Sequence, residues 1–327
     1  MHEATVGELS EGEILDRILA VLAGSSRAVV GPGDDAAVLA APGGRVVVTT
    51  DTLVHGPDFR LAWSGGRDLG FKAAAVNLAD VAAMGARPTA LFVALAMPDD
   101  TRIGFVEELA AGLREACDAL APGCAVEGGD LTVSETLTIA VTAIGVLDGV
   151  APVLRSGARP GDVVAVAGEL GLAARGLAVL FDRFRDAAGE PVAVDDGILS
   201  ADDRRALRAQ LRPAPPVTLG VAAADAGAHA LMDVSDGLAL DARRMAEASG
   251  VTIDLDVAAL GDDPALALDG GEDHALLAAF PGRSLPDGFR AIGRVTARAA
   301  APVTVAGAPY ERAGGWDPYR DWDHRTG

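Results

Sequence analysis

Aspartates lie beside apolar runs at five places in this chain, each next to glycine, serine, threonine or asparagine. The five groups are Gly33-Asp34-Asp35, Thr49-Thr50-Asp51, Asn77-Leu78-Ala79-Asp80, Gly128-Gly129-Asp130 and Asp233-Val234-Ser235-Asp236. Carboxylates at the ends of buried strands and helices stay ionised only where cations neutralise them, so the groups favour one shared metal site. Hard oxygen ligands indicate Mg²⁺, and Mg²⁺ indicates phosphate chemistry. The fold therefore has to bring distant element ends together.

Length and charge limit the class of protein. At 327 residues, half of them hydrophobic, the chain is too long for one ordinary core and favours two domains. A formal charge of −20 argues against general binding to nucleic acid or anionic lipid. No apolar run has membrane-spanning length, the first residues lack the basic start and apolar block of a signal peptide, and Cys117 and Cys124 lack the partners of a zinc site or a disulfide framework. We expect a cytoplasmic protein that does not act at a membrane.

Strand and helix patterns alternate without a regular βαβ rhythm, which predicts a mixed α/β (α+β) fold. Turn-rich residues near 148–160 predict a boundary between a domain over 1–150 and one over 151–327. The patterns predict helices over 9–23, 67–84, 101–120, 172–187, 201–211 and 238–249, and strands over 46–50, 91–97, 137–145, 163–166, 231–236, 251–256 and 275–280. The charged stretch at 182–212, which includes the helix at 201–211, has no assigned role and is expected to be a solvated surface.

Each acidic group also has an ordinary structural explanation when it is taken alone. Residues 31–38 fit an Asp-rich β-turn, Thr49-Thr50-Asp51 a helix N-cap, and 128–130 a Gly-Gly-Asp turn. Asp233 and Asp236 lie three residues apart at the start of a helix, where two acids also complement the helix dipole. Their joint occurrence is what favours a metal site.

Two further segments extend the pattern. Arg155 precedes a Ser-Gly pair near the expected boundary, where its guanidinium could bind phosphate oxygens, although a solvated surface arginine is the commoner case. Gly270-Gly271-Glu272-Asp273 repeats the Gly-Gly-acid pattern, and Glu272 is either a hydrogen-bond acceptor for a polar substrate or a turn acid. The chain has no Walker A lysine motif, GxGxxG or kinase signature, so it must bind phosphate in another way.

Seven segments, taken in order, resemble the thiamine-monophosphate kinases. They are GPGDDAAV at 31–38, TTDTLV at 49–54, FKAAAVNLADVAAMGA at 71–86, GGD at 128–130, RSGARPGD at 155–162, DVSDG at 233–237 and GGED at 270–273. The match spans almost the whole chain. The wider superfamily, which includes aminoimidazole ribonucleotide synthetase, selenophosphate synthetase and a hydrogenase maturation protein, shares only part of the set.

The resemblance implies a two-domain aminoimidazole ribonucleotide synthetase-like fold, whose N-terminal mixed sheet dimerises into a barrel and whose active site lies between the domains. It implies ATP-dependent phosphorylation of thiamine monophosphate to thiamine diphosphate, with several Mg²⁺ ions. It assigns Mg²⁺ to Asp35, Thr49, Thr50, Asp51, Asp80, Asp130, Asp233 and Asp236, ATP contacts to Gly129, Asp130, Arg155 and Ser235, and thiamine contacts to Glu272 and a C-terminal aromatic residue.

The chain departs from the family pattern at two places. The family has a substrate-contacting histidine where this chain has Asp58, and His55 is a possible substitute. The expected Gly-aromatic-Asp-His-Phe ending reads Asp321-Trp322-Asp323-His324-Arg325, and we favour Trp322 over Trp316 as the aromatic residue.

Direct in-line transfer is the expected reaction, because Mg²⁺ ions that bridge ATP and the substrate phosphate offset the repulsion between two anions. A phosphate nucleophile has little need of a general base, so none is assigned. Two alternatives remain: a sister ATP-dependent enzyme acting on a ribotide, selenide or carbamoyl group, and a sensor that binds thiamine phosphate or nucleotide without turnover. The N-terminal region lacks the reactive cysteine of the selenium enzyme.

Overall fold

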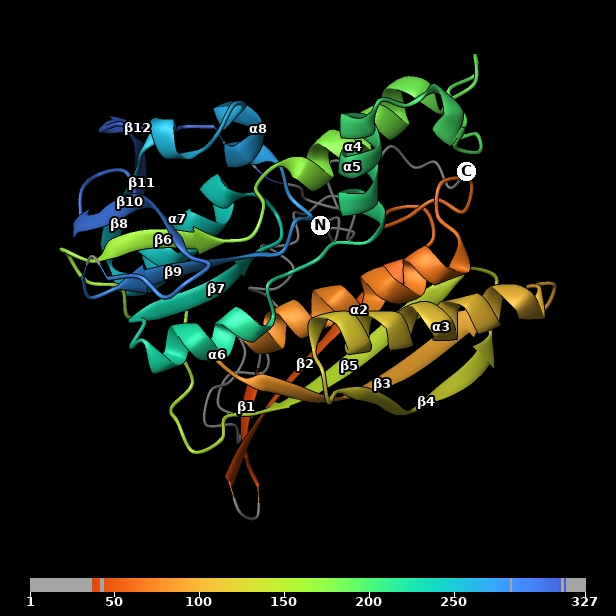
Figure 1. The fold of residues 1–327 in the computed structure, drawn as a ribbon, viewed down its shortest axis with the longest axis horizontal. Coiled ribbons are helices and arrows are strands. Elements are labelled where there is room, and N and C mark those ends of the chain that lie inside the picture. The colour runs from red at the N-terminus through yellow and green to blue at the C-terminus, as the bar shows by residue number, and fades with distance from the viewer. Residues whose placement is uncertain (1–36, 42–43, 283, 313–314, 316–327) are drawn as a thin grey trace, which may run out of the picture.

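The computed structural model describes residues 37–41, 44–282, 284–312 and 315. They form two sheets with helices packed between and around them (Figure 1). The predicted helix at 9–23 lies outside these residues, as do Asp35, Trp316 and Trp322. None of the described helices combines the length and apolar character needed to cross a membrane.

The first sheet has five strands in the order β1-β2-β5-β3-β4. All neighbours pair antiparallel except β3 and β4, which are parallel. The strands are β1 (Ala37–Ala41), β2 (Gly44–Val54), β3 (Arg87–Met97), β4 (Ala125–Val133) and β5 (Thr138–Val146). Helices α2 (Gly66–Ala83) and α3 (Ile103–Leu120) lie side by side over one face (Figure 1).

Glycines bring α2 and α3 into close contact. A Cβ on Gly70 would lie 2.0 Å from the carbonyl oxygen of Leu109, and one on Gly112 would lie 2.1 Å from that of Arg67. Helix α2 is Ala-rich and almost entirely buried, because it also packs against the second sheet and α6 (Thr218–Asp225). It ends before Gly85, whose φ of 71° suits the left-handed conformation after a helix. Helix α2 is thus the central element between the two sheets.

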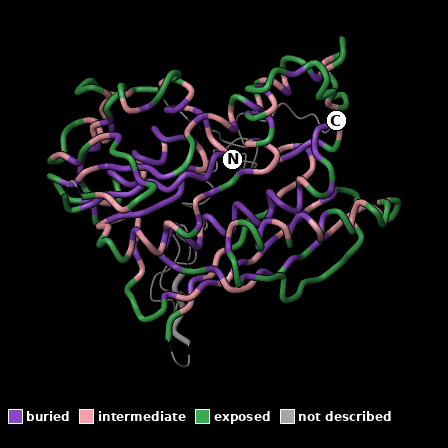
Figure 2. The backbone as a smooth tube through the Cα atoms, viewed as in Figure 1, coloured by how far each residue is buried: buried purple, intermediate pink, exposed green. Residues whose placement is uncertain are grey.

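The second sheet has seven strands in the order β12-β11-β8-β10-β6-β9-β7, of which only β11 and β8 pair in parallel. The strands are β6 (Val163–Ala167), β7 (Ala230–Val234), β8 (Val251–Leu255), β9 (Ala275–Phe280), β10 (Arg290–Ala297), β11 (Val303–Val305) and β12 (Ala308–Pro309). Its further helices are α4 (Leu172–Arg183), α5 (Ala201–Leu211), α7 (Leu238–Ser249) and α8 (Pro264–Asp269), with short 3-10 turns η2 (Asp196–Ile198) and η3 (Val257–Ala259). Strands β7 and β9 of this sheet are buried along their whole length (Figure 2). In the first sheet β5 buries every second residue.

The predicted elements within the described residues are largely confirmed, with three corrections. Strand β2 does not stop at Asp51 but continues to Val54. The Gly128-Gly129-Asp130 segment is part of β4 and not a turn. Helix α5 has the predicted bounds but is not merely a solvated surface, because it buries Asp203, Ala206, Leu207 and Gln210. Leu207 packs with Trp63 and Phe184, which attaches the α4–α5 pair to the loop after β2.

Candidate active site

One half of the site is formed by β2 and the C-terminal part of α2. Thr49 Oγ1 donates a hydrogen bond to Asp80 Oδ2 at 2.8 Å. The backbone N of Asp51 donates to Asn77 Oδ1 at 3.0 Å. Thr49 and Asp51 alternate with Thr50, so both lie on the face of β2 that meets α2. Asn77 and Asp80 are three residues apart and therefore share the opposing face of the helix.

The other half comes from the end of β7 and from the loop before β9. Asp233 is the fourth residue of β7 and is 4% exposed. Its Oδ2 lies 3.0 Å from Nδ1 of His274, which is also buried. His274 N donates to the carbonyl oxygen of Val234 at 3.0 Å, and Glu272 N donates to that of Ser235 at 2.7 Å. The two segments are therefore fastened together by main-chain hydrogen bonds.

Close packing explains why the second segment begins with two glycines. A Cβ on Gly271 would lie 2.4 Å from the carbonyl oxygen of Ser235. The next residue, Glu272, has φ of 74°, in the left-handed region that non-glycine residues seldom adopt. Such strain persists where the surroundings dictate the conformation, and it is common at functional sites.

A buried ion pair connects the two halves. Lys72 of α2 is 4% exposed, and its Nζ forms an ion pair with Glu272 Oε2. Burial opposes ionisation of Glu272, but the positive charges of Lys72 and His274 outweigh it and lower its pKa. Glu272 is thus held as a carboxylate at the junction of α2 and the second sheet.

The electrostatics show that carboxylates from both halves converge. Asp51 keeps contact with solvent on one side, yet the surrounding protein desolvates its carboxylate and raises its pKa. Asp233, Asp236 and Glu272 raise this pKa further through their negative charge, and His274 acts in the opposite direction. Burial raises the pKa of Asp236 as well, with contributions from Asp233 and Glu272, against the lowering effect of Arg244.

Asp58 belongs to the same surroundings. Its Oδ2 accepts a hydrogen bond from the backbone N of Val54 at 2.7 Å. Burial and the charge of Glu272 raise its pKa to about 6, although the Val54 hydrogen bond and Lys72 act against this. His55 stacks on Phe59, with ring centroids 5.6 Å apart.

Two residues of α7 hold Asp236 in place. Arg244 Nη1 donates to Asp236 Oδ2 at 2.6 Å and to Asp241 Oδ1 at 2.8 Å. The other oxygen of Asp241 accepts from the backbone N of Asp236 at 3.1 Å. Asp241 is fully buried, and burial together with the charge of Asp236 raises its pKa to about 7. Both the main chain and the side chain of Asp236 are thereby fixed.

Three of the predicted site residues, Thr50, Gly129 and Asp130, lie apart from this group within one chain. Thr50 lies on the opposite face of β2, where its Oγ1 donates to the carbonyl oxygen of Val141 and accepts from Thr142 Oγ1. Asp130 lies on β4, which β5 and β3 separate from β2. Arg155 lies in the connection between β5 of the first sheet and β6 of the second, and its carbonyl oxygen accepts a hydrogen bond from Ser249 Oγ at 3.3 Å.

The arrangement fits cations bound by oxygen atoms. Asp51, Asp233, Asp236 and Glu272 repel one another electrostatically, and a bound cation would relieve that repulsion. Within the described ranges, no three Asp, Glu, His or Cys side chains are close enough to enclose a metal ion by themselves. At phosphate sites Mg²⁺ usually keeps some of its coordination for substrate oxygens and water.

Five residues of the site were given no role from the sequence, although Asn77 stands in one of the acidic groups. They are Lys72, Asn77, Asp241, Arg244 and His274. Lys72 and Asn77 are polar residues within a mostly apolar helix, and His274 directly follows the Gly-Gly-Glu-Asp motif, so the sequence pattern could have indicated all three. Asp241 and Arg244 form an i, i+3 pair that is also common on solvated helices and gave no such signal.

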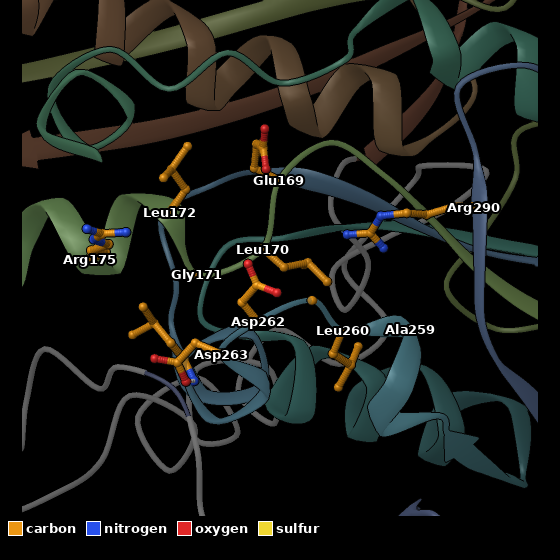
Figure 3. A pocket seen from close by; sticks show the side chains of 12 residues that line it. Glu169, Leu170, Gly171, Leu172, Arg175, Ala259, Leu260, Asp262, Asp263 and Arg290 are labelled. Atoms are coloured by element: carbon orange, nitrogen blue, oxygen red, sulfur yellow. Dashed lines mark hydrogen bonds between the residues drawn. The ribbon is translucent and has the colours of Figure 1, made fainter. Parts of the chain in front are cut away.

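A separate cavity of about 290 Å³ lies in the second half, between the start of α4 and the segment before α8 (Figure 3). Arg175, Arg290, Glu169 and Asp262 line it among apolar side chains. None of the predicted site residues that the structure describes lines this cavity.

Comparisons with known proteins identify the family. A model of the N-terminal domain of AIR synthase related proteins matches residues 33–147. A thiamine-monophosphate kinase from Mycobacterium tuberculosis is 42% identical over 336 aligned residues, which cover 98% of this chain and 95% of that protein. The chain belongs to the thiamine-monophosphate kinase family. This confirms the resemblance seen in the seven sequence segments.

Solved structures agree with the family assignment. That of AaThiL complexed with AMPPCP and TMP has a TM-score of 0.83 and 30% identity, and the match covers 97% of this chain and 99% of that one. The hydrogenase maturation protein HypE in complex with ATP, at 21% identity and a TM-score of 0.57 over 92% of this chain and 94% of that one, shares the fold alone. The two-sheet α/β architecture is thus that of thiamine-monophosphate kinases and their wider superfamily.

Proposed function

We propose that this protein transfers the γ-phosphoryl group of ATP to thiamine monophosphate and forms thiamine diphosphate. The observation that carries the proposal is the convergence of carboxylates from β2, β7 and the loop before β9, in a chain that is 42% identical to a thiamine-monophosphate kinase over almost its whole length. The relative complexed with AMPPCP and TMP supports the same pair of substrates.

Several Mg²⁺ ions would be held by oxygen ligands, some of them in the group described above and others outside it within one chain. The proposed ligands are Asp35, Thr49, Thr50, Asp51, Asp80, Asp130, Asp233 and Asp236. When bound, the ions supply positive charge that offsets the repulsion between two phosphate anions. The carboxylates of the chain orient those ions, and no general base is required, because a phosphate monoester is already an anionic nucleophile.

The substrates are assigned to different parts of the site. Gly129, Asp130, Arg155 and Ser235 are proposed to contact ATP. Glu272, Asp58 and Trp322 are proposed to contact the thiamine moiety. The position of Asp58 supports its assignment, because it lies near enough to Glu272 and Lys72 for their charges to affect its pKa. Asp58 would thus occupy the position of the histidine expected there.

A homodimer would complete the site. Asp130 pairs with Ala94, which lies on the sheet face away from α2, whereas Asp51 lies on the face toward it. Three strand spacings, about 14 Å, also separate Asp51 on β2 from Asp130 on β4. On the outer face Phe92 is 40% exposed, and Leu131 at the β4 edge is 65% exposed. Pairing of this sheet with that of a second copy would cover the apolar surface and let Asp130 reach the partner's site.

Two further proposals concern organisation and location. We place the division between an N-terminal ATP- and Mg²⁺-binding domain and a C-terminal α/β domain at residues 1–150 and 151–327, the connection between β5 and β6. The biosynthetic role that we propose is consistent with location in the cytoplasm.

The deciding experiment is a product assay. Purified protein is incubated with ATP, Mg²⁺ and thiamine monophosphate, and thiamine and its phosphates are separated, with EDTA and free thiamine as controls. Mg²⁺-dependent formation of thiamine diphosphate from the monophosphate, with little from free thiamine, is the expected result. Folded protein that binds ATP but forms no diphosphate would contradict the proposal and favour a sister enzyme or a sensor.

A further inference from the structure

Lys72 is the only lysine in this chain, and every other basic residue among its 27 Lys and Arg is an arginine. The one lysine lies within the buried helix α2, which raises the question whether this position requires a lysine side chain.

The surroundings of Lys72 explain the requirement. Its Nζ forms the ion pair with Glu272 Oε2. In the amide orientation that satisfies both ends of its side chain, Gln210 accepts from Lys72 Nζ at 3.3 Å and donates to the carbonyl oxygen of Ala173 at 3.1 Å. Three segments, α2, α5 and the loop before β9, therefore meet at one ammonium group.

An arginine would fit this position poorly. Its guanidinium is a planar fork with five N–H donors, whereas a lysine ammonium is a compact charge with three rotatable donors. Lys72 is 4% exposed, so unused guanidinium donors would be buried without partners, which is costly. The compact ammonium instead satisfies Glu272 and Gln210 from one point.

Glu272 depends on such a partner. Its backbone is held by the hydrogen bond to Ser235 and by a φ of 74°, but its side chain as a whole retains 37% exposure. An ionised carboxylate can only accept hydrogen bonds. A carboxylate held at a fixed position by a buried ammonium is thus a pre-oriented acceptor for an amino group of a ligand.

We propose that Lys72 is a positioning residue for thiamine recognition, which holds Glu272 ionised and aimed so that it accepts a hydrogen bond from the thiamine moiety. The proposal rests on the proposed function, because it deepens the assignment of Glu272 to the substrate. Lys72 acts through Glu272 and does not itself contact the substrate. Loss of Lys72 should therefore weaken binding of thiamine monophosphate much more than binding of ATP.

Kinetics of Lys72→Met, Glu272→Gln and the double variant test this role. We expect Lys72→Met to raise KM for thiamine monophosphate about 10- to 100-fold, the effect of losing a hydrogen bond to a charged group, with KM for ATP changed less than about threefold. In the Glu272→Gln background, Lys72→Met should add less than about threefold, because the two residues act as one unit.

Arg212→Met is the matched control. Arg212 forms an ion pair with Asp68 of α2, so it also links α2 to the chain after α5, but it does not touch Glu272. We expect it to leave KM for thiamine monophosphate within about threefold of the wild-type value. Equal effects of Lys72→Met and Arg212→Met, or independent effects of Lys72→Met and Glu272→Gln, would overturn the proposal in favour of a purely structural ion pair.

A spectroscopic measurement remains decisive even if Lys72→Met does not fold. Because the chain has one lysine, protein labelled with [ε-13C]lysine gives a single lysine signal. The signal should move in Glu272→Gln and on addition of thiamine monophosphate, and should move much less with a non-hydrolysable ATP analogue and Mg²⁺. A lysine signal whose chemical shift changes neither in Glu272→Gln nor on addition of thiamine monophosphate would refute the positioning role. Absence of kinase activity in the wild-type protein would instead refute the proposed function, whatever the signal shows.

Discussion

His274 Nδ1 lies 3.0 Å from Asp233 Oδ2, and both side chains are buried. Nε2 of this histidine has no hydrogen-bond partner among the described residues. The imidazole is therefore committed to Asp233, which it orients toward the other carboxylates. Mutation of a residue that hydrogen-bonds to a metal ligand typically lowers metal affinity or activity 10- to 100-fold.

His274→Ala should raise the Mg²⁺ concentration needed for half-maximal activity by about tenfold. His274→Asn is the matched variant, since its Nδ2 can donate from nearly the position of the imidazole Nδ1, and it should stay within about threefold of the wild type. Mg²⁺ titrations of initial rates compare the two. Equal half-maximal concentrations for wild type and His274→Ala would show that His274 does not orient a metal ligand.

Arg244→Gln should lower the free energy of unfolding by about 1–3 kcal/mol, because it leaves the buried carboxylate of Asp241 without its charged partner. Urea unfolding in the presence of EDTA measures this. Arg243→Gln is the control on the same helix, where the guanidinium donates to the carbonyl oxygens of Tyr310 and Arg312. If Arg244→Gln lowers the free energy of unfolding no more than Arg243→Gln does, the ion pair with Asp241 does not stabilise the fold.

Asp58 should make stability depend on pH. Its pKa is raised from 3.8 to about 6 in the folded protein, so the folded state binds the proton more tightly than the unfolded chain. The stabilisation is present below about pH 4 and is lost as pH rises through about 6. Asp58→Asn should remove this dependence, which amounts to at most about 3 kcal/mol. Urea unfolding of both proteins between these pH values, without Mg²⁺, provides the test, and parallel pH profiles would argue against a raised pKa.

Gly271→Ala should lower turnover and reduce stability by about 1–3 kcal/mol, because the added methyl group would meet the main chain of Ser235. Gly282→Ala, where a Cβ has no heavy atom within 4 Å, should be nearly neutral. Thermal unfolding and initial rates measure both variants. A neutral Gly271→Ala would mean that the loop before β9 does not need to approach β7 so closely.

Mixing two inactive variants should test the shared site. If each site combines Asp51 of one copy with Asp130 of the other, a mixture of Asp51→Asn and Asp130→Asn dimers, after subunit exchange, should regain about one quarter of wild-type activity. Each variant alone should be nearly inactive. No recovery, with subunit exchange verified by mass, would contradict a contribution of Asp130 in trans.

The sequence predicted most elements and part of the site for identifiable reasons. Strand β5 was predictable because it is a short apolar run rich in β-branched residues, and helix α2 because a long Ala-rich apolar run is ended by Gly85. The repeated acidic motifs suggested that Asp51, Asp233 and Asp236 converge, but they could not show it, because a sequence does not reveal distances between residues in the fold. The placement of Gly129 and Asp130 inside β4 was missed, because Gly-Gly-Asp also has strong turn preferences that the pairing with β3 overrides.

The Lys72–Glu272 and Arg244–Asp241 pairs could not be predicted for a different reason. The first joins residues 200 positions apart across two sheets. The second is a local helix pair whose importance comes only from the burial of Asp241. Residues that support a site through its ligands thus become visible once packing is known.

The most direct test of the account is the Mg²⁺ dependence of thiamine diphosphate formation by Asp51→Asn, with Asp148→Asn as the control. Asp148 forms an exposed ion pair with Arg87 away from the carboxylate group, so its variant should retain wild-type rates. Asp51→Asn should lose about 100-fold or more in turnover at saturating substrates while its unfolding midpoint in EDTA stays the same or rises, because a carboxylate with a raised pKa is removed. Wild-type turnover and Mg²⁺ dependence in Asp51→Asn would contradict the central claim that these converging carboxylates form the phosphoryl-transfer site.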